Sequence, residues 1–231
     1  MTNTNYYAVV PAAGVGKRMQ ADKPKQYLPL LDKTVIEQTL LQLLSTDVFS
    51  AIAVAISDGD TYWPALKIAK HPQIIRAKGG KERADSVLSA LSALENKAVD
   101  DDWVLVHDAA RPCVSSKEIH QLLKSLQNEA CGGILALASH DTLKQVDGDV
   151  IQKSVDRRTI WRALTPQMFR YGVLKKSLTQ TIGNPAITDE ASAIELTGGV
   201  VKIVEGSTEN IKITRPEDLA LAQFYLENQR D

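Results

Sequence analysis

The sequence has few cysteines and no long apolar segment. It contains only 2 cysteines, Cys113 and Cys131, without the short spacing of a metal-binding pair, so we expect both to be reduced packing residues. No apolar run approaches the roughly 20 residues of a membrane span. The first residues, Met1-Thr-Asn-Thr-Asn, are polar and uncharged, unlike a signal peptide. These absences predict a soluble, cytoplasmic protein without a membrane partner.

An excess of charge of one sign is also absent. The 27 basic and 28 acidic residues leave a net charge of −1, which argues against a nucleic-acid partner. Any attraction for an anionic ligand must therefore be local. With 44% hydrophobic residues, the chain of 231 residues can bury one α/β core, with or without a small appendage. We expect a single domain over residues 1–231.

Short apolar runs alternate with helical patterns, which predicts βα units and a mostly parallel sheet flanked by helices. Capping boxes at Thr34 and Ser115 mark two helix starts, and Pro216 marks a third. A further amphipathic helix is predicted over 82–94. The predicted strands are 7–11, 51–56, 73–76, 103–107, 133–138, 200–204 and an alternating segment at 211–213.

Residues 139–163 interrupt this rhythm with two alternating segments around Asp147-Gly148. Asp-Gly between such segments is a strong signal for a β-hairpin. A hairpin that projects from an α/β core has two open edges, which a second subunit commonly covers. We therefore expect a β-arm that forms a homodimer; the alternative is a surface hairpin packed on its own domain.

The loop over residues 11–26 follows the first predicted strand, at the end of the sheet where open α/β folds bind ligands. Its small residues allow backbone N–H groups to approach phosphate oxygens, and its cations give it a local positive charge. The small residues are Ala12, Ala13, Gly14 and Gly16, and the cations are Lys17, Arg18, Lys23 and Lys25, against the single anion Asp22. This concentration suits a triphosphate, although a solvated basic loop is the plainer alternative.

Two common phosphate loops do not match this segment. The dinucleotide motif G-x-G-x-x-G has Met19 in place of its third glycine, and the P-loop motif has Arg18 in place of its hydroxyl residue.

Motifs along nearly the whole chain resemble those of the 2-C-methyl-D-erythritol 4-phosphate cytidylyltransferase family. The matching segments are 11–19, 24–26, 79–87 (Gly-Gly-Lys-Glu-Arg-Ala-Asp-Ser-Val), 106–112 (Val-His-Asp-Ala-Ala-Arg-Pro), 155–157, 164–167, 188–192 (Thr-Asp-Glu-Ala-Ser) and 210–219. The segment between Thr142 and Ser154 matches no pattern of the family. The resemblance implies a Rossmann-like domain with a dimerising β-arm, and CTP and Mg²⁺ as ligands.

The resemblance also implies roles for particular residues. Arg18 and Lys25 are the expected catalytic cations on the CTP phosphates, with the backbone of residues 12–16 around them. Gly80 and Ser86 would contact cytosine, and Asp108 with Ala109 would lie near the ribose, Asp108 also facing the metal. The residues implied for 2-C-methyl-D-erythritol 4-phosphate are Arg111, Arg157, Thr165, Thr188 and Lys212, of which Arg157 and Thr165 belong to the arm region and would come from the partner subunit.

The sequence leaves plainer roles open for four of these residues. Asp108 and Arg111 could form a local ion pair in a turn, and Thr188 could be a helix N-cap. Lys212 on its own would be placed on the surface. We expect His107 to be a packed strand residue, because one histidine makes no metal site.

The implied reaction is attack of a substrate phosphate oxygen on the α-phosphorus of CTP, with pyrophosphate leaving in line. A phosphate monoester is already anionic, so the chemistry needs positioning and electrostatic stabilisation rather than a general base. A pentitol-phosphate cytidylyltransferase and a non-catalytic nucleotide-binding regulator remain alternatives.

Overall fold

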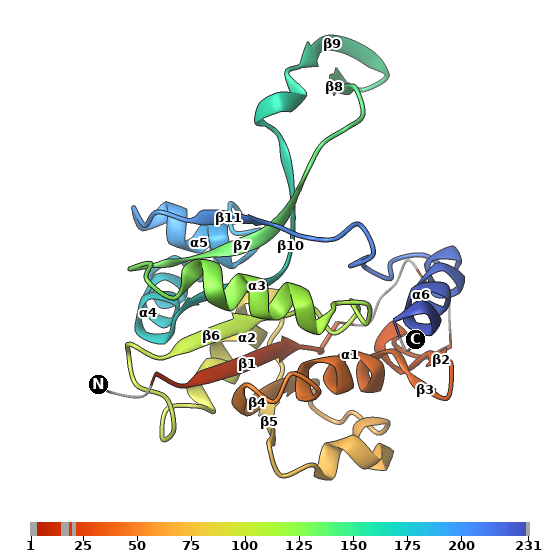
Figure 1. The fold of residues 1–231 in the computed structure, drawn as a ribbon, viewed down its shortest axis with the longest axis vertical. Helices are drawn as coiled ribbons and strands as arrows, with labels where there is room; N and C mark the ends of the chain where they lie inside the picture. Colours follow the sequence, from red (N-terminus) through yellow and green to blue (C-terminus); the bar gives the residue numbers. More distant parts are fainter. Residues whose placement is uncertain (1–3, 15–18, 20–21, 230–231) are drawn as a thin grey trace.

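A seven-stranded sheet organises the chain in the computed structural model, which describes residues 4–14, 19 and 22–229 (Figure 1). The strand order is β11-β7-β10-β6-β1-β4-β5. β10 runs antiparallel to both of its neighbours, whereas the other pairings are parallel. The strands are β1 (Tyr6–Pro11), β4 (Phe49–Ile56), β5 (Ile74–Lys78), β6 (Trp103–Val106), β7 (Gly132–Ala138), β10 (Trp161–Arg170) and β11 (Lys202–Glu205).

Helices cover both faces of the sheet, because alternate residues of each strand point to opposite sides. Ala8 and Val10 of β1 pack in one core with α1 (Val35–Leu44) and α3 (Ser116–Leu126). Tyr7 and Val9 pack in a second core with α2 (Arg83–Ser92), α4 (Tyr171–Thr181) and α5 (Glu190–Leu196). This three-layer arrangement confirms the predicted α/β class with a mostly parallel sheet.

The C-terminal helix α6 (Glu217–Asn228) closes a smaller apolar cluster beside the main sheet. This cluster also includes Met19, Leu30 and Val35, near the two-stranded ribbon of β2 (Pro29–Leu30) and β3 (Lys33–Thr34). The helix thereby packs against the part of the chain that follows the phosphate loop. The described residues also form four short 3₁₀ helices: η2 (Lys25–Tyr27), η3 (Trp63–Ala65), η4 (Lys67–Lys70) and η5 (Arg157–Thr159).

A hairpin projects away from the sheet, as Figure 1 shows at the top of the view. It consists of β8 (Leu143–Asp147) and β9 (Val150–Val155), which pair with each other in a separate two-stranded sheet. Gly148 occupies the turn with φ of +54°, a conformation that glycine adopts without steric cost. The predicted hairpin around Asp147-Gly148 is therefore confirmed.

Two elements were not predicted, and one prediction about the elements was wrong. The strand β10 was missed because Pro166 lies inside it, and proline argues against an internal strand. The helix α4 was missed as well. Residues 211–213 form no strand and have no regular structure.

Among the described helices, none combines the length and the apolar character that crossing a bilayer requires.

Candidate active site

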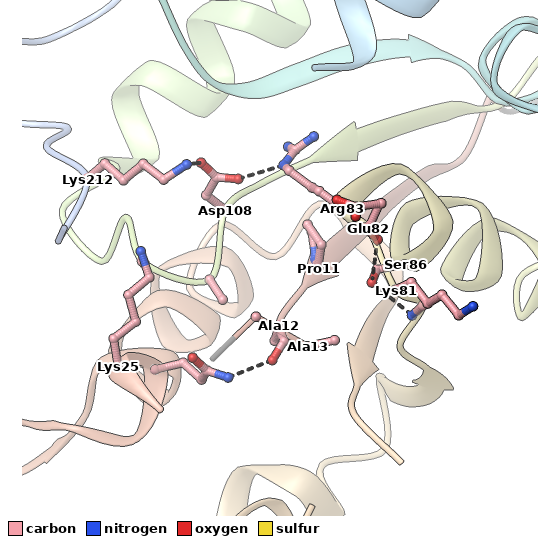
Figure 2. Close-up of a pocket in the computed structure, with 15 residues that line it drawn as sticks. Pro11, Ala12, Ala13, Lys25, Lys81, Glu82, Arg83, Ser86, Asp108 and Lys212 are labelled. Atoms are coloured by element: carbon pink, nitrogen blue, oxygen red, sulfur yellow. Dashed lines mark hydrogen bonds and ion pairs between the residues drawn. The ribbon is translucent and has the colours of Figure 1, made fainter. Parts of the chain in front are cut away.

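The candidate site is a pocket at the carboxyl ends of β1 and β6 (Figure 2). β1 lies between β6 and β4, so the chain leaves β1 in one direction and later returns on its other side. Such a switch point opens a crevice where α/β folds bind their ligands. The described residues that line the pocket are Pro11–Gly14, Lys25, Gln26, Gly80–Arg83, Ser86, Asp108–Ala110 and Lys212.

Two side chains hold the first residues of the phosphate loop, one from the end of the loop and one from the segment after β4. Gln26 Nε2 donates to the Ala12 carbonyl at 2.7 Å, and Ser57 Oγ donates to the Ala13 carbonyl at 2.9 Å. Ala12, Ala13 and Gly14 line the pocket, and contact of their backbone with phosphate oxygens stays a prediction. The predicted residues Gly16 and Arg18 lie outside the described residues.

Gly80 and Ser86 form the opposite wall at the start of α2. The Gly80 N–H donates to Ser86 Oγ at 3.0 Å, and the same hydroxyl donates to the Glu82 carbonyl at 3.2 Å. A Cβ on Gly80 would lie 2.1 Å from Cβ of Asp85, so only glycine allows this close approach. Both residues line the pocket, where the sequence placed them.

Asp108 is the centre of the site's electrostatics, as Figure 2 shows. Its Oδ2 lies 2.7 Å from Lys212 Nζ, and its Oδ1 lies 3.2 Å from Arg83 Nε. Arg111 Nε lies further away, 3.7 Å from Oδ2. Burial alone would raise the pKa of Asp108, but the charges of Arg83, Lys212 and Arg111 hold that pKa well below its usual range. The carboxylate is therefore ionised at neutral pH.

The predicted alternative of a local Asp108–Arg111 pair is present as well. The Arg111 N–H donates to the Asp108 carbonyl at 3.1 Å, closing the turn. Its guanidinium is buried, and Nη1 donates to the Asn210 carbonyl at 2.6 Å. Arg111 thus links the Asp108 turn to the 210–213 segment, and its side chain is absent from the pocket lining.

A chain of hydrogen bonds through Thr165 and His107 holds the turn that carries Asp108. The Asp108 N–H donates to Thr165 Oγ1 at 3.0 Å, and Thr165 Oγ1 lies 3.0 Å from His107 Nδ1. His107 Nε2 lies 3.0 Å from the Arg111 carbonyl, which can only accept, so Nε2 carries the proton. Nδ1 then accepts from Thr165, and the imidazole is neutral. Burial lowers the pKa of His107 to about 4.

Thr165 therefore lies in β10, outside the hairpin arm, and its hydroxyl is engaged within its own chain. The side chain is 5% exposed. The expectation that it belongs to the arm is wrong, because β10 crosses the sheet beside β6 and carries Thr165 directly under Asp108. His107 is confirmed as a packed residue.

Lys25 and Lys212 line the pocket from the side opposite Gly80 and Ser86. Lys25 Nζ donates to the Ile213 carbonyl at 2.9 Å, so both lysines are tied to the 210–213 segment. Lys212 keeps 38% of its side chain exposed. The two ammonium groups thus reach the pocket from segments far apart in sequence.

Two predicted substrate residues lie elsewhere in the protomer. Thr188 lines a neighbouring pocket, which Glu82 and Arg83 separate from the first. It is not the N-cap of α5, because Asp189 fills that position by accepting from the Ser192 N–H. Arg157 lies at the base of the arm, exposed, and donates to the His140 carbonyl.

Sequence reasoning missed Arg83 and Glu190. Arg83 Nη2 donates to Glu190 Oε2 at 3.0 Å, and Nη1 donates to Oε1, while Nε faces Asp108. The signal was present: an arginine in the first turn of a helix opposes the helix dipole, so it needs an acidic partner. Both residues belong to motifs that the sequence marked as similar to the family, without a role.

Comparison with known proteins agrees with this geometry. The family model described as IspD, 2-C-methyl-D-erythritol 4-phosphate cytidylyltransferase, matches residues 6–228. The 2-C-methyl-D-erythritol 4-phosphate cytidylyltransferase of Vibrio vulnificus (strain YJ016) is 51% identical over 230 residues, covering 99% of this chain and 97% of its own. That of Pseudomonas putida (strain GB-1) is 51% identical over 217 residues, covering 93% and 92%.

The fold is shared as well. The crystal structure of the Francisella tularensis enzyme superposes with a TM-score of 0.84 at 38% identity, covering 96% of this chain and 100% of its own. The chain therefore belongs to the IspD family of 2-C-methyl-D-erythritol 4-phosphate cytidylyltransferases, the CTP-dependent enzymes of the non-mevalonate isoprenoid pathway.

Proposed function

We propose that the pocket beside Asp108 is where this chain joins CTP to 2-C-methyl-D-erythritol 4-phosphate. One observation carries the proposal: Lys212 and Arg83 meet on Asp108 while Lys25 faces the same pocket, next to the small-residue turn after β1. Two polyanions must approach each other in this reaction, and such cations offset their repulsion.

The nucleotide is assigned to the wall between the phosphate loop and α2. Gly80 and Ser86 lie at the cytosine, Ala12, Ala13, Gly14 and Gly16 at the phosphates, and Asp108 with Ala109 at the ribose. Gly80 permits close packing, and its fixed backbone would let the base be recognised by hydrogen bonds. Arg18 and Lys25 are assigned to the triphosphate, where an ammonium can follow an oxygen as charge develops.

The second substrate is assigned to the side of Lys212. Its phosphate oxygen attacks the α-phosphorus of CTP, a new P–O bond forms, and the bond to the β-phosphate oxygen breaks to release pyrophosphate. No proton needs to move, because the attacking phosphate is already anionic. Arg111 and Thr165 support this side by holding the Asp108 turn, and Thr188 and Arg157 are assigned to the same substrate.

A divalent cation, Mg²⁺, is assigned to Asp108. The fit rests on the chemistry of the donors: an ionised carboxylate faces the pocket, and Mg²⁺ requires only one or two protein carboxylates when phosphates supply the rest. When bound, Mg²⁺ would neutralise phosphate charge. Lys212, partly exposed, would contact a phosphate from its place beside Asp108.

The oligomer is assigned to a homodimer formed through the arm within residues 139–163, in a single domain of 1–231. The exposed apolar residues Val146, Val150 and Ile151 of the arm support this assignment. Arg157, at the base of the arm, would then reach the partner's pocket. A cytoplasmic location stays a prediction from the sequence.

Pyrophosphate release tests the assignment. With CTP and Mg²⁺, turnover is expected with 2-C-methyl-D-erythritol 4-phosphate and not with ribitol 5-phosphate, and chelation by EDTA should abolish it. Turnover confined to the pentitol phosphate would contradict the assigned acceptor. CTP binding without turnover on any polyol phosphate would favour a regulator instead.

The shared site is tested with mixed dimers. A subunit carrying Arg157→Ala is combined with one carrying Lys25→Ala, so that one of the two pockets regains both residues only if Arg157 acts across the interface. Recovery of part of the activity supports the partner assignment. Mixed dimers as inactive as the two parents would contradict it.

A further inference from the structure

The guanidinium of Arg83 contacts two carboxylates, those of Glu190 and Asp108. Nη1 and Nη2 donate to the two oxygens of Glu190, and Nε lies 3.2 Å from Asp108 Oδ1. Glu190 is 1% exposed and belongs to α5, on the far side of Arg83 from the pocket. Its carboxylate therefore reaches the pocket only through Arg83.

The location of Arg83 makes this contact necessary. Arg83 opens α2, where the positive end of the helix dipole disfavours a cation. Burial would lower its pKa, but Glu190 and Asp108 raise that pKa above its usual range, so Arg83 stays charged. Glu190 opens α5, where the dipole favours an anion. The two helix ends thus face each other with opposite charges.

We propose that Glu190 is a positioning residue for the cytidylyl transfer: by holding both Nη groups of Arg83, it leaves only Nε for Asp108 and so keeps the second oxygen of Asp108 for Lys212. The inference deepens the proposed function and rests on it. Glu190 of α5, Arg83 of α2, Asp108 of the turn after β6 and Lys212 of the 210–213 segment form a row of alternating charges.

A different arrangement of Arg83 would be unproductive. Arginine prefers to bind a carboxylate with two parallel N–H groups. Without the charge of Glu190, Arg83 would turn its fork onto Asp108, occupy both oxygens and displace Lys212. Lys212 would then be misplaced for the substrate phosphate, and displacement of such a group by about 1 Å can cost on the order of 10²-fold in rate.

Glu190→Gln tests the inference, since it keeps the shape of the side chain. The amide oxygen can still accept from one Nη group, but the amide NH₂ faces the other donor. We expect kcat to fall about 10- to 100-fold while KM for CTP changes less than about threefold, because the phosphate loop and Gly80 are untouched. Glu195→Gln, the same change at an exposed position of α5, is the matched control and should leave both constants unchanged.

A double-mutant cycle separates positioning from a purely structural role. In a Lys212→Met background, Glu190→Gln should lower kcat less than about threefold further, because the residue it positions is already gone. If the two substitutions lower kcat independently, so that their fold-changes multiply in the double variant, the inference is overturned. An unchanged kcat in a folded Glu190→Gln protein would overturn it as well.

Removal of one partner of a buried ion pair can unfold a protein. If Glu190→Gln does not fold, Arg83→Gln/Glu190→Gln removes both charges and leaves none unpaired. Because Glu190 acts only through Arg83, this double variant should have the kcat of Arg83→Gln alone, and a kcat clearly below that of Arg83→Gln would overturn the inference. Wild-type turnover in the same assay separates this outcome from failure of the proposed function, which would leave the unaltered enzyme inactive.

Discussion

Lys212 reaches Asp108 because backbone hydrogen bonds on both of its sides hold it there. The Ile213 N–H donates to the Ala110 carbonyl at 2.8 Å, and the Asn210 carbonyl accepts from Arg111 Nη1. The segment is thereby fixed to the turn after β6 at two points. A lysine on a segment without regular structure is thus placed at 2.7 Å from the carboxylate.

We predict that Lys212→Met lowers kcat/KM about 10²- to 10³-fold, the usual cost of removing one group that stabilises developing charge. Lys212 is partly exposed, so the loss of its ion pair should change the free energy of unfolding by less than about 1 kcal/mol. Pyrophosphate release gives the rate, and a thermal melt gives the stability. Lys202→Met, at an exposed position of β11, is the control. Equal activity of the two variants would contradict the role of Lys212.

We predict that Lys25→Ala lowers turnover by about 10²- to 10³-fold and leaves the fold intact. Its ammonium lines the pocket and is half-buried. Lys23→Ala removes an exposed cation two residues away, which is absent from the pocket lining, and should keep most of the activity. Calorimetric titration with CTP adds a binding measurement. A folded Lys25→Ala protein with near-normal turnover would count against the assignment.

The sheet was largely predictable because its strands are buried on both faces and appear as continuous apolar runs, such as Trp103–Val106. The capping boxes at Thr34 and Ser115 were predictable for a local reason: a segment of four residues contains both the donor and the acceptor. The strand β10 was not predictable, because its pairing with β6 and β7 depends on contacts remote in sequence. In addition, Pro166 interrupts the residue pattern that is typical of a strand.

The pocket could be predicted only as separate motifs. The sequence placed the loop after β1 and Asp108 after β6, and the topology brings them together. It could not show that Arg83 lies between Asp108 and Glu190, since that contact joins α2 to α5. Lys212 was assigned by resemblance alone, because the backbone contacts that hold it are not encoded in any local pattern.

We predict that stability falls as the pH drops from about 6.5 to about 4, owing to His107. Its pKa is depressed in the folded state, so the unfolded chain takes up a proton there while the folded chain does not. The stabilising contribution is complete above the unfolded pKa of about 6.5 and is lost toward the folded value. With about 1.4 kcal/mol per pKa unit, the loss amounts to about 3 kcal/mol.

Urea unfolding at several pH values measures this slope. His107→Gln, which cannot take up a proton, should unfold with a weaker pH dependence over the same interval. Imidazole NMR provides an independent check, because His107 should stay neutral at pH 6, with its proton on Nε2. Titration of His107 near pH 6.5 would contradict the hydrogen-bond chain through Thr165.

We predict that Ile151→Lys converts the proposed dimer into a monomer. Ile151 pairs across the hairpin with Val146, and both side chains are more than half exposed, at 58% and 57%. Two apolar side chains paired at the tip of a projecting arm gain stability only if another surface covers them, and a second subunit would do so. A lysine at that contact would bury an unpaired charge, which an interface does not tolerate. Sedimentation velocity measures the outcome, with Val99→Lys, an exposed apolar residue outside the arm, as the control. A wild-type protein that sediments as a monomer at micromolar concentration would contradict the dimer itself, and a dimeric Ile151→Lys protein would move the interface away from this face of the arm.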